Sequence, residues 1–543
     1  MKTRIKYVIA GFLTILVIHC YCQDGWQFAK QIGGKGSDDG SVYMDLASNI
    51  YCGGIFTGNC YFDHDTLYAG NSTSTGCFLA KYDAAGNEIW VKQIGGITPY
   101  DAYEYCGIAA IDKNNNCLYF TGSFQGRLTI DTSTIYSSGG FDIFLAKYDL
   151  SGNCLWLKKV SSPSDDGPDG LQLDNNGNIY WTGRLGGSGI LDTINLSAGV
   201  FLAKLDQSGN IIYARNEMTG GYLTKLKILN NNILITGVST NKVITLDTDT
   251  LSSTKYFGIL LAKIDLTGNV IKAVKFESSG ESAGTGLEID PENNIYLIGC
   301  FEDSLNIRGN IMVSNNKYMD MTFCKFDSSF TLKWFRQSHN TGDHGTYLAD
   351  IVFDPEGKLY VTGFFSGNAT FGDYNVTSTS ISDMILARYD TSGTCLGLKY
   401  FGLANGGRLS LYDDGSPLVS GSFWSMVNIG NTTLTSYGDY DMFFAKSDPI
   451  TGIEGKKQTF SDQLIIYSNP TTGKCNISIP DDFRHEKNLI LQILDNIGKV
   501  IQIIPVVMDQ DKISFNISAE AKGMYNAILS NGKKRYSGKI IFE

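Results

Sequence analysis

The chain has 543 residues, enough for two or more domains, and its 43% hydrophobic and 12% aromatic residues exclude a disordered protein. The 61 glycines and the many Tyr and Phe residues favour an all-β fold with tight turns. The net charge of −11, with acidic and basic residues mixed throughout, argues against nucleic acid as a partner.

Residues 1–22 have the pattern of a secretory signal peptide. Lys2, Arg4 and Lys6 precede an apolar run from Tyr7 to Ile18, and cleavage is expected near Cys22. No later stretch has the roughly 20 apolar residues that a spanning helix needs. We therefore expect an exported chain with no membrane span once the signal is removed.

Three short signatures repeat seven times between residues 24 and 448. The signature "FLAKYD" recurs at intervals of 57 to 66 residues, and its copies begin at Phe78, Phe144, Phe201, Leu260, Thr322, Ile385 and Phe443. The signature "IYxxG" begins at Ile50, Leu118, Ile179, Ile233, Ile295, Leu359 and Pro417. The third, "W-x-K", has its basic residue at Lys30, Lys92, Lys158, Arg215, Lys275, Arg336 and Lys399. A period of this length indicates a repeat architecture.

Each repeat contains apolar alternation on both sides of a turn, which predicts β-hairpins. An Asp followed by Gly-Asn or a close variant separates "FLAKYD" from "W-x-K", and these residues favour a tight turn. We therefore interpret the repeated aspartates as turn formers rather than a catalytic ring. They are Asp83, Asp149, Asp206, Asp265 and Asp390.

Four strands in each of seven units predict a seven-bladed β-propeller over residues 24–448. The fragment "FAKQIGG", Phe28 to Gly34, has no hairpin partner before it, and the strand beginning at Phe443 has none after it. We expect the N-terminal strand to complete the last blade. "FLAKYDAAGNEIWVKQIGG", from Phe78 to Gly96, resembles the bacterial secreted β-propeller repeat family, which implies extracytoplasmic location and no common enzymatic activity.

After a polar linker at residues 449–460, residues 461–543 alternate apolar runs with Asn-Pro, Gly-Lys and Asn-Gly turns, which predicts a small β-sandwich. This segment resembles the type A sorting domain of the type IX secretion system of Bacteroidetes. The residues that carry the resemblance include Tyr467, Asn469, Pro470, Gly473, Gly523, Tyr525 and Lys539. The resemblance implies interaction with the secretion machinery and release or attachment at the cell surface.

The sequence contains few candidate catalytic or metal-binding residues. Asp38, Asp39, Asp165 and Asp166 are expected in loops on one face of the ring, where they either bind calcium or form turns. The second interpretation is favoured, so we expect no obligatory cofactor. "HNTGDH", with His339, Asp343 and His344, is interpreted as a surface loop. "GESAG" matches a nucleophile elbow around Ser282 but is expected to lead into a strand.

Ten cysteines follow the signal, and they are either buried free thiols or disulfides. Cys106 with Cys117, and Cys300 with Cys324, are the candidate pairs.

The sequence does not identify a ligand. The leading hypothesis is a non-enzymatic surface or secreted protein that uses the ring face and its loops to bind a carbohydrate or a protein. The alternatives are a propeller enzyme, a polysaccharide lyase or hydrolase, and a structural adhesin. The enzyme alternative requires polar side chains near the ring axis.

Overall fold

The computed structural model describes residues 25–543 except 72–73, 96–101, 230–231, 248, 315–317, 339, 343, 451–463, 465, 468–469, 481–482, 484–488, 496–499, 507–511 and 531–534. The predicted signal peptide, residues 1–22, therefore lies outside the described residues. The chain divides into two units, Met1–Gly455 and Lys456–Glu543, and this division falls within the predicted linker. The described residues form strands and no α-helix, which confirms the all-β prediction.

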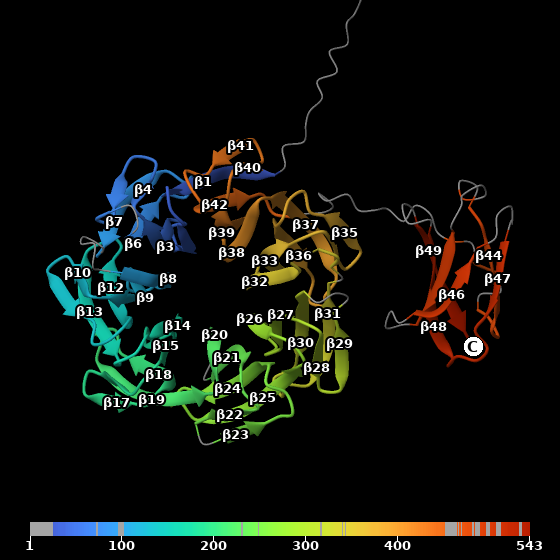
Figure 1. Ribbon diagram of the computed structural model, residues 1–543, viewed down its shortest axis with the longest axis horizontal. Coiled ribbons are helices and arrows are strands. Elements are labelled where there is room, and N and C mark those ends of the chain that lie inside the picture. The colour runs from blue at the N-terminus through green and yellow to red at the C-terminus, as the bar shows by residue number, and fades with distance from the viewer. Residues whose placement is uncertain are drawn as a thin grey trace, which may run out of the picture. The chain divides into compact units, whose positions relative to one another are not determined.

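In the part of the first unit that the structure describes, seven antiparallel sheets of four or six strands are arranged around a central axis (Figure 1), and three short hairpins form two-stranded sheets of their own. Each of the seven larger sheets contains one four-stranded blade, and we number the blades 1 to 7 by their innermost strands. The innermost strands are β2 (Asp39–Met44), β8 (Ala102–Asp112), β14 (Gly167–Leu173), β20 (Gly221–Leu229), β26 (Ser282–Ile289), β32 (Thr346–Phe353) and β38 (Ala404–Leu411). The second strands, which carry "IYxxG", are β3 (Ile50–Thr57), β9 (Cys117–Gln125), β15 (Ile179–Leu185), β21 (Asn232–Ser239), β27 (Ile295–Phe301), β33 (Leu359–Phe365) and β39 (Pro417–Phe423).

The third and fourth strands of each blade carry "FLAKYD" and "W-x-K". The third strands are β6 (Thr75–Tyr82), β12 (Asp142–Asp149), β18 (Gly199–Leu205), β24 (Gly258–Asp265), β30 (Asp320–Phe326), β36 (Asp383–Tyr389) and β42 (Asp441–Ser447). The fourth strands are β7 (Glu88–Ile94), β13 (Cys154–Ser161), β19 (Ile211–Thr219), β25 (Val270–Ser278), β31 (Leu332–Gln337), β37 (Cys395–Gly402) and β1 (Trp26–Gly34). The second and third strands are almost entirely buried, as expected for apolar strands packed between neighbouring sheets.

The N-terminal strand closes the ring, as predicted. β1 pairs with β42 and is the fourth strand of the sheet β38-β39-β42-β1. Its residues from Ala29 to Ile32 lie opposite Ala445 to Met442, and Ile32 is fully buried. Gly33 fits because a β-carbon there would collide with the carboxyl group of Asp441.

The turns between third and fourth strands confirm the structural interpretation of the repeated aspartates. The Asp206 carboxylate accepts backbone N–H bonds from Ser208 at 2.9 Å and Asn210 at 2.8 Å, and also accepts from the Asn210 side-chain amide. These bonds, led by the one from the side-chain amide, lower the pKa of Asp206. Asp83, Asp149, Asp265 and Asp390 accept equivalent backbone bonds.

A short outer hairpin follows the second strand of every blade and lies toward the preceding blade. Four of the hairpins pair directly with the preceding blade's fourth strand, for example β16-β17 with β13. The hairpins are β4 (Asn59–Tyr61) with β5 (Thr66–Tyr68), β10 (Arg127–Ile130) with β11 (Ser133–Tyr136), β16 (Gly189–Leu191) with β17 (Ile194–Leu196), β22 (Val243–Leu246) with β23 (Asp249–Ser252), β28 (Ser304–Ile307) with β29 (Asn310–Val313), β34 (Asn368–Phe371) with β35 (Tyr374–Thr377), and β40 (Met426–Ile429) with β41 (Thr432–Thr435).

Three of the seven basic residues of "W-x-K" form ion pairs with the exchanged hairpins. Lys30 pairs with Asp63 at 2.6 Å, and Lys158 pairs with Asp192 at 2.8 Å. Arg215 pairs with Asp247 in the same way. These three basic residues therefore connect neighbouring blades.

The second unit contains two sheets around one apolar core, which confirms the predicted β-sandwich. One sheet is β43 (Ile466–Tyr467), β44 (Lys474–Ser478) and β47 (Lys512–Asn516). The other is β45 (Ile490–Leu494), β46 (Val500–Pro505), β48 (Gly523–Ser530) and β49 (Arg535–Phe542). Nowhere in the described part of the chain does a helix reach the length and hydropathy needed to cross a bilayer.

Candidate functional site at the mouth of the axial channel

The inner strands form a hydrogen-bonded belt around the axis. Most of them contain a β-bulge at a corresponding position, and a bulge re-aims a side chain. The bulge residue Thr285 of blade 5 donates from Oγ1 to the Leu348 carbonyl of blade 6 at 2.5 Å. The bulge residue Thr224 of blade 4 donates similarly to the Gly284 carbonyl of blade 5. The belt joins successive blades and fixes the residues that line the channel.

A cavity of about 720 Å³ lies where the inner strands of blades 3 and 4 begin. We call it the mouth pocket. Its lining includes Ser123, Asp165, Asp166, Pro168, Arg184 and Gly221. Glycines form much of the remaining lining, so the backbone is accessible to a ligand.

Arg184 is the basic residue of the mouth pocket. Its side chain is 48% exposed, and its Nε donates to Oδ1 of Asp169 at 3.1 Å. The guanidinium carbon lies 4.7 Å from the centre of the Tyr222 ring. Asp169 also accepts the N–H of Leu223, and burial raises its pKa to about 7 although Arg184 opposes the shift. The guanidinium is therefore oriented by two groups and still reaches solvent.

Ser123 supplies a hydroxyl that lacks a protein partner. The residue is 1% exposed, and its Oγ makes no hydrogen bond in the structure. Buried hydroxyls are nearly always satisfied, so this atom favours a bound polar ligand or an ordered water in the mouth pocket. Asp165, which is exposed, accepts the Phe141 N–H at 3.0 Å through Oδ1.

A second aromatic surface lies at the same end of the channel. Tyr347 is the second residue of β32, the position that Tyr222 occupies in β20, and the inner strands repeat in direction from blade to blade. The Tyr347 ring stacks on that of Phe364, with centroids 5.4 Å apart and an interplanar angle of 15°. Both side chains are half-buried, so the stacked pair offers a partly accessible apolar edge.

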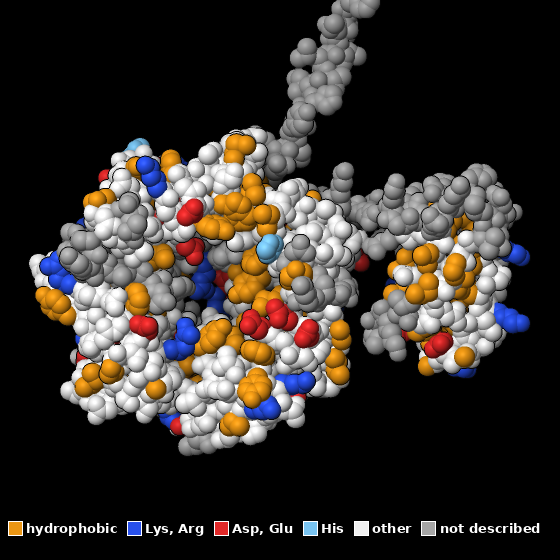
Figure 2. Space-filling model, in the orientation of Figure 1, with side chains coloured by type: hydrophobic (Ala, Val, Ile, Leu, Met, Phe, Trp, Pro, Cys, Tyr) orange, Lys and Arg blue, Asp and Glu red, His pale blue; other side chains and the backbone are white. Residues whose placement is uncertain are grey.

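The axis itself is polar. Figure 2 shows Lys and Arg side chains within a hollow at the centre of the ring. The inner strands carry Lys225, Lys227 and Arg408, and Lys225 pairs with Asp350. Polar side chains therefore lie near the ring axis, as the enzyme alternative requires. That alternative stays a prediction.

The four candidate calcium ligands lie at two separate blade junctions. Asp38 is fully buried, and its two oxygens accept the N–H groups of Gly34 at 2.6 Å and Thr57 at 2.9 Å. Burial raises the pKa of Asp38 to about 7, although the two backbone hydrogen bonds lower it. Asp166 accepts from Ser162 and Gly186 in the same manner, while Asp39 and Asp165 are exposed. Asp38 and Asp166 therefore shape their loops, and calcium binding stays a prediction.

The remaining sequence motifs are "GESAG" around Ser282 and "HNTGDH" from His339 to His344. Ser282 begins β26 and is followed by strand, so the strand-turn-helix geometry of a nucleophile elbow is absent from this described segment. His339 and Asp343 lie outside the described residues, and His344 is exposed. Within the described ranges, no group of three or more His, Cys, Asp or Glu residues is placed to hold a metal ion.

The two candidate disulfides are wrong. Cys106 lies opposite Gly122 and Cys117 opposite Asp112, while Cys300 lies opposite Met321 and Cys324 opposite Leu297. All four are free thiols.

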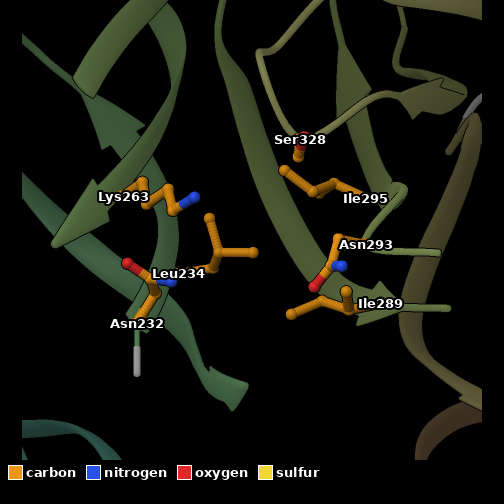
Figure 3. Close-up of a pocket in the computed structure, with 7 residues that line it drawn as sticks. All are labelled: Asn232, Leu234, Lys263, Ile289, Asn293, Ile295 and Ser328. Atoms are coloured by element: carbon orange, nitrogen blue, oxygen red, sulfur yellow. The ribbon is translucent and has the colours of Figure 1, made fainter. Parts of the chain in front are cut away.

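A smaller pocket between blades 4 and 5 is shown in Figure 3. Leu234, Lys263, Ile289 and Ile295 are among its lining residues, and its volume is about 30 Å³. That volume accommodates about one water molecule, so the pocket is too small for an organic ligand.

The sorting-motif residues surround the end of the chain. The turn after the exposed Pro470 places Thr471 beside the C-terminal strand: its N–H donates to Ile541 O at 2.8 Å, and its carbonyl accepts from Glu543 at 3.0 Å. Gly473 has a φ of 122°, which favours glycine. The remaining placements are as follows: Tyr467 lies in β43, Gly523 begins β48, Tyr525 is buried, Lys539 is exposed in β49, and Asn469 lies outside the described residues.

Comparison with known proteins supports this division of the chain. Residues 465–543 match the family model of the secretion system C-terminal sorting domain. This domain marks the chain for type IX secretion to the cell surface or the medium. The chain is 22% identical over 338 residues to the uncharacterized WD repeat-containing protein L264 of Acanthamoeba polyphaga mimivirus, covering 49% of this chain and 24% of that protein.

A second curated relative, the regulatory protein FlaEY of Caulobacter vibrioides, is 22% identical over 265 residues, covering 44% of this chain and 27% of that protein. The chain thus spans about a quarter of the length of these relatives. Among solved structures, the Dos1 propeller is similar with a TM-score of 0.40 and 11% identity, covering 78% of this chain and 96% of that one.

Proposed function

We propose that this chain is an exported, non-enzymatic binding protein whose propeller takes a carbohydrate at the mouth pocket. The observation that carries the proposal is the combination of a half-exposed Arg184 with the unpartnered buried hydroxyl of Ser123 in one cavity of about 720 Å³. Cavities of several hundred Å³ with a few convergent polar groups are typical of small-molecule sites.

The chemistry of the mouth pocket suits a polyhydroxylated ligand. Arg184 and backbone N–H groups donate hydrogen bonds, Asp165 accepts them, and Ser123 does either. The Tyr222 ring and the Tyr347–Phe364 pair supply flat apolar surfaces for the C–H faces of sugar rings. A protein ligand would instead need a surface of roughly 800 Å² per partner around this mouth.

The second unit would direct the secretion of this binding module. We propose that residues 461–543 contact the secretion machinery, and that the turn at Pro470 to Gly473 forms part of the recognised surface. Its hydrogen bonds to Ile541 and Glu543 would keep the motif and the chain end in one fixed arrangement.

A glycan and peptide screen on the full chain tests the proposal. We expect glycan binding, reduced at least about tenfold by Arg184→Ala and by Tyr222→Ala, the loss expected for one charge-assisted hydrogen bond or one stacked ring. Lys333→Ala is the matched control, because Lys333 pairs only with Asp327 among the described ion pairs and is 46% exposed. Binding to peptides alone, or glycan binding unchanged by both mouth variants, contradicts the proposal. Running the screen with and without a chelator tests the calcium prediction separately.

A further inference from the structure

Blade 7 carries a group of partly exposed aromatic side chains. Tyr437 and Tyr440 lie in the loop between β41 and β42 and are 56% and 44% exposed. The Tyr437 ring centroid lies 5.1 Å from that of Tyr61 in β4, and the Tyr440 ring centroid lies 5.4 Å from that of Trp424. Tyr61 and Trp424 are half-buried. We call these four residues the blade 7 patch, and Figure 2 shows hydrophobic side chains gathered over this blade.

Two of these aromatic residues depart from the sequence repeat. Counted back from "FLAKYD", the counterparts of Tyr437 are Ser72, Ser138, Asn195, Thr254, Asn316 and Thr379. Counted forward from "IYxxG", the counterparts of Trp424 are Thr57, Gln125, Gly186, Thr240, Glu302 and Ser366. Every counterpart is small or polar, so the other blades form without an aromatic ring at either position. The rings of blade 7 are therefore not required by the repeat, which favours a local role in binding.

The loop that carries Tyr437 and Tyr440 is held by its backbone. The Tyr437 N–H donates to Oδ2 of Asp441 at 3.0 Å, and the Tyr440 carbonyl accepts the N–H of Asp38 at 2.7 Å. Among the described residues, no hydrogen bond engages either phenol hydroxyl. The two rings are thus presented from a fixed backbone, and their hydroxyl groups are available to a ligand.

The blade 7 patch lies on the same face of the ring as the mouth pocket. Asp166 lines the mouth pocket, and its N–H donates to the Phe141 carbonyl at 2.7 Å. Phe141 directly precedes β12 as Tyr440 directly precedes β42, and Asp166 directly precedes β14 as Asp38 directly precedes β2. Because the strands repeat in direction from blade to blade, these equivalent bonds place both loops on one face.

The size and chemistry of the blade 7 patch favour a carbohydrate over a protein. A buried Tyr or Trp removes roughly 150–250 Å² from solvent, so the exposed parts of the four rings amount to on the order of 300 Å². A stable protein interface needs roughly 800 Å² per partner. Tyr and Trp combine a flat apolar face with a polar tip, and a pyranose ring presents a C–H face bordered by hydroxyl groups.

We propose that the blade 7 patch is a second carbohydrate-binding site, which takes neutral pyranose units of a polysaccharide against the rings of Tyr437 and Tyr440. The inference rests on the proposed function only for the class of ligand, since no residue of the patch lines the mouth pocket. A polysaccharide long enough to reach both sites would bind more tightly than a short oligosaccharide at either one.

Affinity electrophoresis of the full chain tests the proposal, in native gels that contain xylan, mixed-linkage β-glucan or α-mannan, with gelatin as the protein comparison. We expect at least one polysaccharide to retard the chain. Tyr437→Ala and Tyr440→Ala should each weaken its binding about three- to tenfold, the loss of one aromatic stacking contact. Tyr437→Phe keeps the ring and should retain most of the binding. Both positions are about half exposed, so the variants should fold, as circular dichroism checks.

Tyr256→Ala is the matched control, because Tyr256 is 58% exposed in the corresponding loop of blade 4, and it should change nothing. Arg184→Ala separates the two sites. Weaker binding on adding Tyr437→Ala to Arg184→Ala supports the blade 7 patch whether or not the mouth pocket binds sugar. Binding weakened by Arg184→Ala but unchanged by Tyr437→Ala and Tyr440→Ala supports the mouth pocket alone and overturns the patch. Retardation by gelatin alone, or by no polysaccharide, also overturns it.

Discussion

Ring closure by the N-terminal strand gives the sharpest stability prediction, because the chain contains its own control. Ile32 in β1 and Ile94 in β7 occupy the same position of the repeated fragment "KQIGG", and both are buried to within 1%. Ile32 packs with Met442 and Phe444 of the last blade. If β1 is a full member of the ring, Ile32→Ala should cost as much free energy of unfolding as Ile94→Ala, about 2–5 kcal/mol for a buried isoleucine.

Urea unfolding of the full chain, followed by tryptophan fluorescence, measures this cost. All six tryptophans lie between residues 26 and 424, so the signal reports the propeller and not the sorting domain. Ile89→Ala, at a side chain that is 51% exposed, should change stability by at most about 0.5 kcal/mol. If Ile94→Ala lowers the free energy of unfolding by about 2 kcal/mol or more and Ile32→Ala does not lower it, the closure is refuted. Truncating a side chain on a strand that is not packed in the ring would not change the stability.

Three further predictions follow from the structure. Burial raises the pKa of Glu217 to about 8, and neither oxygen of its carboxylate has a hydrogen-bond partner, so the folded state loses stability as the pH rises above the unfolded pKa of 4.5. In thermal unfolding, the stability advantage of Glu217→Gln should therefore grow by at most roughly 3 kcal/mol between pH 5 and pH 7.5, and a pH-independent difference would contradict this. The buried thiols of Cys77 and Cys106 share a hydrogen bond across blades 1 and 2, so a disulfide-exchange oxidant should link them, as seen by mass spectrometry; recovery of both as free thiols would count against it. Deleting residues 541–543 removes the partners of Thr471 and should keep the chain inside the cell envelope, whereas normal recovery in the medium or on the surface would show that the chain end is dispensable.

The sequence was sufficient for the blades because their determinants are local. Apolar alternation and the Asp-x-x-Gly-Asn turns act within one hairpin, and the unpaired fragment from Phe28 to Gly34 identified the closing strand. The exchange of outer hairpins between blades was not predicted. Their strands are three or four residues long, and the edge to which they bind belongs to another repeat, so no pattern within the segment reveals the partner.

Arg184 was not predicted as a site residue, because it belongs to no feature that recurs from repeat to repeat. Arg184 departs from its counterparts, which are Ile55, Ser123, Val238, Cys300, Phe364 and Ser422. This difference from the other repeats could have been recognised in the sequence. The ion pair between Lys225 and Asp350 could not be predicted from the sequence, because the two residues are 125 positions apart and meet only through the ring geometry and the bulges of the inner strands.

The central claim is that the ligand binds at the mouth of the axial channel. Hydroxyl-radical footprinting of the full chain, with and without the strongest glycan from the screen, tests it most directly. The account predicts protection of Tyr222 and Tyr347, and unchanged oxidation of Tyr136 and Tyr256, which are 63% and 58% exposed on the outer hairpins and loops. Protection at Tyr136 or Tyr256 with none at Tyr222 and Tyr347 would contradict it.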